Sequence, residues 1–163
     1  MKRVLVLVLL LVAAWSAGVW AEERVTVFMD LAWGDPPEAL GEPILIEDNQ
    51  GLSAYRRADE VTHLGSVPVT DIVYGFSGDG LLNVRVSSSD PSALLDALRA
   101  RYGRPTTDRA YEVAWRLPGQ DTYVSYKRDV LGRNADFSLT SISLAAAYNE
   151  WRRQQAQEDA ASW

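Results

Sequence analysis

The stretch "TDIVYGFSGDGLLNVRVSSS" (residues 70–89) decides the fold class. Large apolar residues occupy every second position on both sides of a Gly-Asp-Gly turn: Ile72, Tyr74, Phe76, Leu82, Val84 and Val86. A period of two places side chains on one face of a strand, and glycines at the turn favour a hairpin. The stretch therefore predicts a β-hairpin with one buried face.

The segment after the hairpin predicts a helix followed by a strand. In "LLDALRARYGRPTTDRAYEVAW" (residues 94–115) the apolar residues of the first half share one helical face: Leu94, Leu95, Leu98 and Tyr102. Asp90 can cap this helix with Pro91 in its first position, and Gly103 can end it. We expect a helix over Ser92–Tyr102, and then a strand with an apolar face formed by Tyr111, Val113, Trp115 and Leu117.

Working outward, further alternating stretches predict more strands. They are "RVTVFM" (24–29), "LSAYRRA" (52–58), "TYVSYKR" (122–128) and "FSLTSISL" (137–144), the last with a bulge near Thr140 or Ser141. A helical pattern follows from about residue 145. Strands in hairpins with one long internal helix indicate an α+β fold. We expect a mostly antiparallel β-sheet, the internal helix packed on one face, and a C-terminal helix.

The first 21 residues have the pattern of a secretory signal peptide. Met1-Lys2-Arg3 is a basic start, Val4–Val12 is an apolar run, and Val19-Trp20-Ala21 suits cleavage before Glu22. A retained membrane anchor is the alternative, although the apolar segment is short for a spanning helix. The prediction is a signal peptide over 1–21 and a single α+β domain over 22–163, with a helical tail from about 145. The protein would be periplasmic or secreted, and would meet a membrane only through an uncleaved signal segment.

The composition limits the partners and the redox chemistry. Acidic residues outnumber basic ones, 22 against 16, and removal of Lys2 and Arg3 makes the remainder more acidic. Phosphate backbones require a basic surface, so a nucleic-acid partner is not expected. The chain has no cysteine, which excludes disulfides, thiolate nucleophiles and lipid attached to cysteine.

The residues that could carry catalysis are few. His63 is the only histidine, so a multi-histidine metal site is excluded, and a surface hydrogen bond is the simpler interpretation of this residue. Tyr123 and Lys127 are four apart, as in short-chain dehydrogenases, but no glycine-rich dinucleotide loop precedes them. We predict no catalytic residue, no metal ion and no cofactor. A small carboxylate-based hydrolase of cell-wall sugar or peptide remains the alternative.

Aromatic residues point to binding. Tyr123 is expected on the outward face of its strand, and the tail carries Tyr148, Trp151, Arg152 and Arg153. Exposed rings and arginines are common where proteins bind other proteins or sugars. The sequence therefore favours a non-catalytic binding module for an envelope protein or glycan, with these five residues as candidate contacts.

The order of motifs resembles a family of small exported bacterial proteins without an assigned activity. Its pattern is a first strand ending in Trp-Gly, a "Y-x-F" hairpin, a helix closing on Tyr-Gly and a following strand with Trp. The matching positions here are Trp33-Gly34, Tyr74, Phe76, Tyr102-Gly103 and Trp115, within residues 28–115. The resemblance implies the fold and the compartment, and it carries over no catalytic residue.

Overall fold

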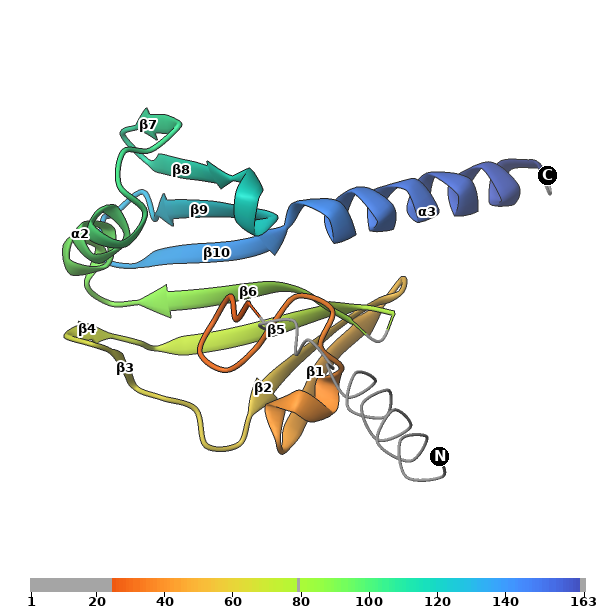
Figure 1. Cartoon of the computed structure of the whole chain (residues 1–163), viewed down its shortest axis with the longest axis horizontal. Coiled ribbons are helices and arrows are strands. Elements are labelled where there is room, and N and C mark those ends of the chain that lie inside the picture. Colours follow the sequence, from red (N-terminus) through yellow and green to blue (C-terminus); the bar gives the residue numbers. More distant parts are fainter. Residues whose placement is uncertain (1–24, 79, 162–163) are drawn as a thin grey trace, which may run out of the picture.

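The computed structural model describes residues 25–78 and 80–161, and the predicted signal peptide lies outside them (Figure 1). Its main element is an eight-stranded antiparallel sheet with the order β1-β2-β5-β6-β10-β9-β8-β7. The strands are β1 (Pro43–Asn49), β2 (Leu52–Arg57), β5 (Asp71–Ser77), β6 (Gly80–Ser88), β7 (Thr107–Arg109), β8 (Glu112–Leu117), β9 (Thr122–Arg128) and β10 (Ala135–Ser141). A small hairpin joins β2 to β5, made of β3 (His63–Leu64) and β4 (Val67–Pro68). The helices are α2 (Pro91–Tyr102) and α3 (Ile142–Ala161), with 3-10 turns η1 (Pro37–Leu40) and η2 (Pro118–Gln120). The predicted α+β class is confirmed.

The sheet consists of two similar halves. In the first, β1, β2, β5 and β6 neighbour one another in chain order and α2 follows, while in the second β7, β8, β9 and β10 do the same and α3 follows. The halves meet where β6 pairs with β10, with Val86 opposite Phe137 and Val84 opposite Leu139. The chain thus builds one wide sheet from two meanders, each closed by a helix.

One face of the sheet is buried and the other is not. The buried face carries Tyr74, Val84, Phe137, Val124 and Trp115, all at most 5% exposed. Helix α2 covers the second half of this face, and the loop with η1 covers the first half through its buried residues Phe28, Leu31 and Leu40. The loop also reaches the second half, because the Phe28 ring lies 6.5 Å from that of Phe137 and the Trp33 indole donates to the Thr122 hydroxyl at 3.0 Å.

The predicted helix and hairpin are both confirmed. The Asp90 carboxylate accepts a hydrogen bond from the Ala93 amide at 2.9 Å, as a capping residue should, and Gly103 ends α2 with a φ of 71°. Leu94 and Leu98 are buried under the helix. In the hairpin Tyr74 lies opposite Val84, and an irregularity after Gly75 changes the register so that Phe76 lies opposite Leu81. Leu81 therefore takes the place in the core cluster predicted for Leu82, although Leu82 is also buried.

The strand predicted for 24–29 is wrong where the structure describes it. The chain turns at Met29, which has a φ of 51°, and the Leu31 amide donates back to the Phe28 carbonyl at 3.0 Å. Phe28 is buried, whereas Val25 is 65% exposed. The alternation of Val25, Val27 and Met29 therefore does not mark a buried strand face, because the turn directs Phe28 to the core.

Two predicted details at other strand ends are also corrected. Tyr111 is 57% exposed and precedes β8, so the buried face of that strand starts at Val113. The strand expected to reach 144 ends at Ser141, and α3 begins at Ile142. The phase change between Leu139 and Ile142 thus reflects the start of a helix and not a bulge.

The start of α3 is fixed by hydrogen bonds from its first turn. The Ile142 amide donates to the Asp121 carbonyl at 3.0 Å, the Ser143 amide to the Asp121 carboxylate at 2.9 Å, and the Leu144 amide to the Ser141 hydroxyl at 3.1 Å. Three of the four amides that a helix start leaves without partners are thus satisfied. Neither α2 nor α3 is long and apolar enough to cross a membrane.

Candidate functional site

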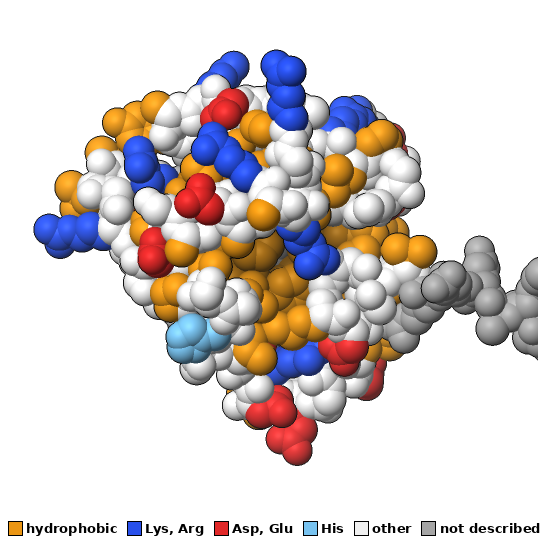
Figure 2. All heavy atoms as spheres, turned by 60° about the vertical axis from the view of Figure 1, so that its left-hand side comes forward, with side chains coloured by type: hydrophobic (Ala, Val, Ile, Leu, Met, Phe, Trp, Pro, Cys, Tyr) orange, Lys and Arg blue, Asp and Glu red, His pale blue; other side chains and the backbone are white. Residues whose placement is uncertain are grey.

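An apolar groove opens in the middle of the buried face, between α2 and the loop that covers the first half of the sheet. Its volume is about 690 Å³, within the range of roughly 300–1,000 Å³ usual for small-molecule sites. The lining residues come from the N-terminal loop, the β3–β4 hairpin, α2 and β10: Val27, Phe28, Met29, Leu64, Gly65, Val67, Leu94, Ala97, Leu98, Ala100, Arg101, Tyr102 and Phe137. Figure 2 shows an apolar hollow on this side of the molecule, with lysine or arginine side chains at its border.

The helical wall of the groove comes from a regular stripe on α2. Leu94, Ala97, Leu98 and Arg101 follow the spacing i, i+3, i+4, i+7, so they lie on one face of the helix. Ala97 is the small member of this stripe and leaves space where a leucine would fill it. The short side chain of Ala97 therefore contributes to the width of the groove.

The opposite wall is made of turns. Met29 has a left-handed φ of 51°, which is costly for a residue other than glycine, and its side chain is 39% exposed at the groove. Gly65 lies in the β3–β4 turn with a φ of 62°, a conformation that glycine adopts without strain. This wall therefore presents an adaptable thioether side chain and bare backbone to the groove.

Among the described residues that line the groove, Arg101 is the one that carries a charge. Its guanidinium lies 5.5 Å from the centre of the Tyr102 ring. The ion pairs within the described residues do not include Arg101, whereas Arg99, two positions away, pairs with Asp108 at 3.0 Å. The groove thus combines an apolar interior with a positive charge that has no acidic partner in the described part of the chain.

A polar cluster lies behind Phe28, whose ring meets that of Tyr74 edge-on at 6.3 Å. Arg57 extends over the Tyr74 ring at 5.5 Å and pairs with Asp30 at 2.8 Å, and the Tyr74 hydroxyl donates to Glu60 at 3.2 Å. Burial, together with the negative charge of Glu60, raises the pKa of Tyr74. Arg57 Nε and Glu60 Oε2 are buried without a hydrogen-bond partner. One carboxylate, that of Asp30, thus pairs with Arg57, and a second, that of Glu60, acts on the same arginine electrostatically without pairing with it.

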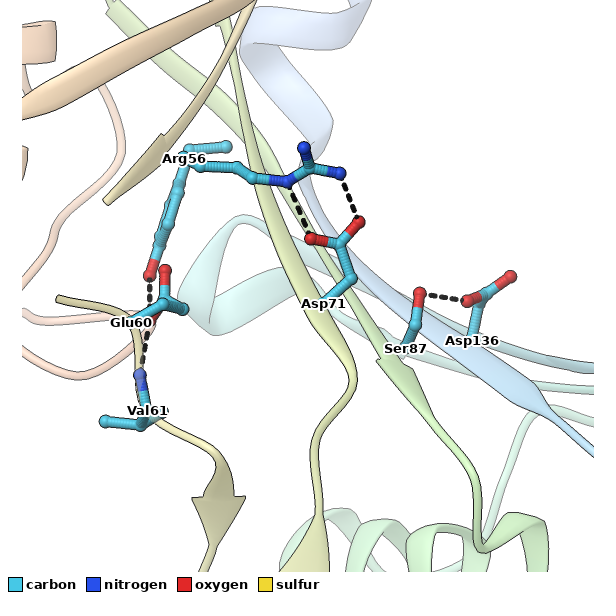
Figure 3. Close-up of polar contacts among 7 residues, drawn as sticks. Arg56, Glu60, Val61, Asp71, Ser87 and Asp136 are labelled. Atoms are coloured by element: carbon cyan, nitrogen blue, oxygen red, sulfur yellow. Dashed lines mark hydrogen bonds and ion pairs between the residues drawn. The ribbon is translucent and has the colours of Figure 1, made fainter. Parts of the chain in front are cut away.

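The uncovered face of the sheet is polar and internally paired. Figure 3 shows Arg56 forking onto Asp71, with distances of 2.7 and 2.8 Å, and Ser87 donating to Asp136 at 2.5 Å across the β6–β10 pair. The Arg56 hydrogen bonds lower the pKa of Asp71. Lys127 lies 3.9 Å from Glu112 on the same face. These charges already have partners, so the face offers less to a ligand than the groove does.

The five residues predicted for binding are only partly brought together. Tyr148 and Trp151 stack with ring centres 5.9 Å apart, and the Tyr148 hydroxyl donates to the Gln50 carbonyl at 3.2 Å. A methyl group on Gly51 would come within 2.8 Å of the Trp151 ring, so this ring lies directly on the β1–β2 turn. The pair anchors the first turns of α3 to the tip of that hairpin.

The other predicted contacts lie elsewhere on the surface. Arg152 and Arg153 follow on the exposed part of α3, where Arg153 pairs with Glu150. Tyr123 is 39% exposed on β9, opposite Arg116 of β8 and Thr140 of β10, and its ring stacks on neither of the two tail aromatics. The five residues thus do not form one surface.

His63 is exposed on β3, and its Nδ1 lies 3.1 Å from the Thr62 hydroxyl. The described residues contain no group of three or more His, Asp or Glu side chains that could hold a metal ion.

No family model, curated protein or solved structure matches this chain. The groove itself was not predicted from the sequence. The signal that could have indicated it is the α2 stripe, in which an alanine and an arginine take positions that a fully packed helix would fill with large apolar residues.

Proposed function

We propose that this protein is a non-catalytic binding module of the bacterial cell envelope, and that it binds through the groove beside α2. The groove is the observation that carries the proposal. A folded chain that keeps a concave apolar surface open to water loses the free energy that filling it would release, and such surfaces commonly bind ligands. The envelope location rests on the signal-peptide pattern of residues 1–21.

The chemistry of the groove favours an apolar portion of an envelope partner over a bare glycan. A sugar presents many hydroxyl groups, and each would lose its water without finding a hydrogen-bond partner among Val27, Leu94 and Phe137. The polar sheet face around Tyr123 is the better candidate for a glycan, but four of its charged side chains are already paired, Arg56 with Asp71 and Lys127 with Glu112.

The test is capture from native envelope extract with matched variants of the groove. Ala97→Phe places a ring in the groove, and Asp96→Phe adds the same ring to an exposed position of α2 that does not line it. We expect a ligand or partner that binds to the unaltered protein and to Asp96→Phe to be lost from Ala97→Phe. Equal capture by all three proteins would contradict binding through the groove.

A carboxylate-based hydrolase is the second candidate, because Asp30 pairs with Arg57 and Glu60 acts on the same arginine electrostatically. Its test is turnover of murein or of a peptide panel by the purified protein. Activity that Glu60→Gln abolishes, while the fold is retained, would favour the enzyme and contradict the binding module.

A further inference from the structure

From the charge and shape of the groove we infer that its ligand is a long-chain fatty acid, with the acyl chain inside the groove and the carboxylate on Arg101. The inference rests on the proposed function and names the class of ligand for the same site. It depends on three observations: the extent of the apolar lining, the position of the charge, and the lack of an acid to neutralise it.

The apolar lining suits a flexible hydrocarbon. The groove runs from the N-terminal loop to Phe137 in the floor, and its walls include the half-exposed Met29 and the small Ala97. Such a surface offers contacts along its length without directional hydrogen bonds, which is what an acyl chain can use. Its volume of about 690 Å³ lies well inside the range for a ligand of this size.

The positive charge of Arg101 indicates a ligand with a negative charge. The protein has a net charge of −6, whereas the charge that the described residues bring to the groove lining, that of Arg101, is positive. The other arginine of the last turn of α2 is already paired, because Arg99 lies 3.0 Å from Asp108 on the side of the helix away from the groove. Arg101 has no such pair within the described residues, and its guanidinium can fork onto a carboxylate with two parallel hydrogen bonds.

The two features together select the ligand. An uncharged alkane or alcohol would not balance the charge of Arg101, and a cationic amphiphile would be repelled by it. An anionic group without a chain would leave the groove empty. A single chain that ends in a carboxylate satisfies both parts of the site.

The experiment is calorimetric titration of the protein, purified from its native host, with hexadecanoate. We expect saturable binding of one molecule per chain. Each methylene removed from the ligand should weaken binding about fourfold where that methylene is buried, so dodecanoate should bind much more weakly. Hexadecanol should also bind more weakly, by about tenfold or more, because it lacks the charge-assisted hydrogen bonds.

Substitutions separate the charge from the chain. Arg101→Gln should weaken hexadecanoate about tenfold or more and leave hexadecanol unchanged, while Arg101→Lys retains part of the difference. Arg99→Gln removes an equal charge from the same helix turn and should have no effect. Circular dichroism of each variant confirms that α2 is intact.

Three results would overturn the inference. They are no saturable binding of hexadecanoate, equal binding of hexadecanoate and hexadecanol, or binding that is unchanged in Arg101→Gln. Binding of lysophosphatidylglycerol without binding of hexadecanoate would also overturn it, in favour of a phosphate head group. Each of these results leaves the binding module standing if Ala97→Phe still abolishes capture from the envelope extract, so the two proposals can fail separately.

Discussion

Replacing Leu98 by alanine tests whether the groove is open space in the native protein. Leu98 is 5% exposed, and its side chain forms part of both the core and the groove wall. The change removes about three buried carbon groups, which at roughly 0.8 kcal/mol each corresponds to about 2.4 kcal/mol of the free energy of unfolding. A closed cavity would add a further loss, and enclosed leucines therefore cost about 2–5 kcal/mol in total.

The space vacated by Leu98 joins the groove and does not create a new closed cavity. We therefore expect a loss of about 2–3 kcal/mol, in the lower half of that range. Leu139 is the matched control, since it is 1% exposed on β10 and does not line the groove. Leu139→Ala should cost more, about 3–5 kcal/mol. Both losses are large beside the roughly 5–15 kcal/mol of a typical domain.

The assay is urea unfolding followed by tryptophan fluorescence, with Trp115 as a fully buried reporter. A loss below about 0.5 kcal/mol for Leu98→Ala would show that α2 does not bury this face. A loss for Leu98→Ala equal to that of Leu139→Ala would refute the open groove, because it would mean that both side chains leave enclosed cavities.

Three further predictions concern α3 and the N-terminus. Burial raises the pKa of Asp121, but hydrogen bonds from Ser141 and Ser143 outweigh it, so the pKa of Asp121 lies below its ordinary value. Its contribution to stability is then present above about pH 4 and lost as pH falls through the folded pKa. Asp121→Asn replaces a charged acceptor by a neutral one in the hydrogen bonds from Ser141 and Ser143, and should cost about 1 kcal/mol at pH 7. It should also remove that part of the acid dependence, measured by urea unfolding at pH 7 and pH 3. An unchanged acid dependence would contradict this role of Asp121. Trp151→Ala should speed hydrogen exchange in the first turns of α3 while lowering global stability by less than about 1.5 kcal/mol. Arg152→Ala is the control and should leave the exchange unaffected. Equal exchange in both variants would show that the Trp151 ring does not anchor α3. The protein recovered from its host should begin at Glu22, as read by N-terminal sequencing, and an intact Met1 in the membrane fraction would contradict cleavage.

The parts of the fold that could be predicted are those in which local chemistry and burial agree. Asp90, Pro91 and Gly103 mark the ends of α2 through capping and backbone preference, and these do not depend on the rest of the chain. The β5–β6 hairpin is likewise specified by alternation and glycine. The first segment fails because alternation was the only signal there, and the turn at Met29 has no glycine to announce it. A left-handed methionine is stabilised by tertiary contacts, which a single sequence does not display.

The groove could not be predicted for a related reason, since it is a property of two elements that approach from opposite ends of the sheet. The apolar residues of α2 fit a buried helix face equally well whether or not a second layer meets them, so Leu94 and Leu98 alone indicate only packing. What distinguishes the groove is the distance between α2 and the loop around Phe28, and that distance is set by how the two halves of the sheet are joined at β6 and β10. Both elements reach the middle of the sheet, where the Phe28 ring lies 6.5 Å from that of Phe137 and α2 contacts β10, so the opening is the space left between them. Arg101 at its border then decides which ligands can use it.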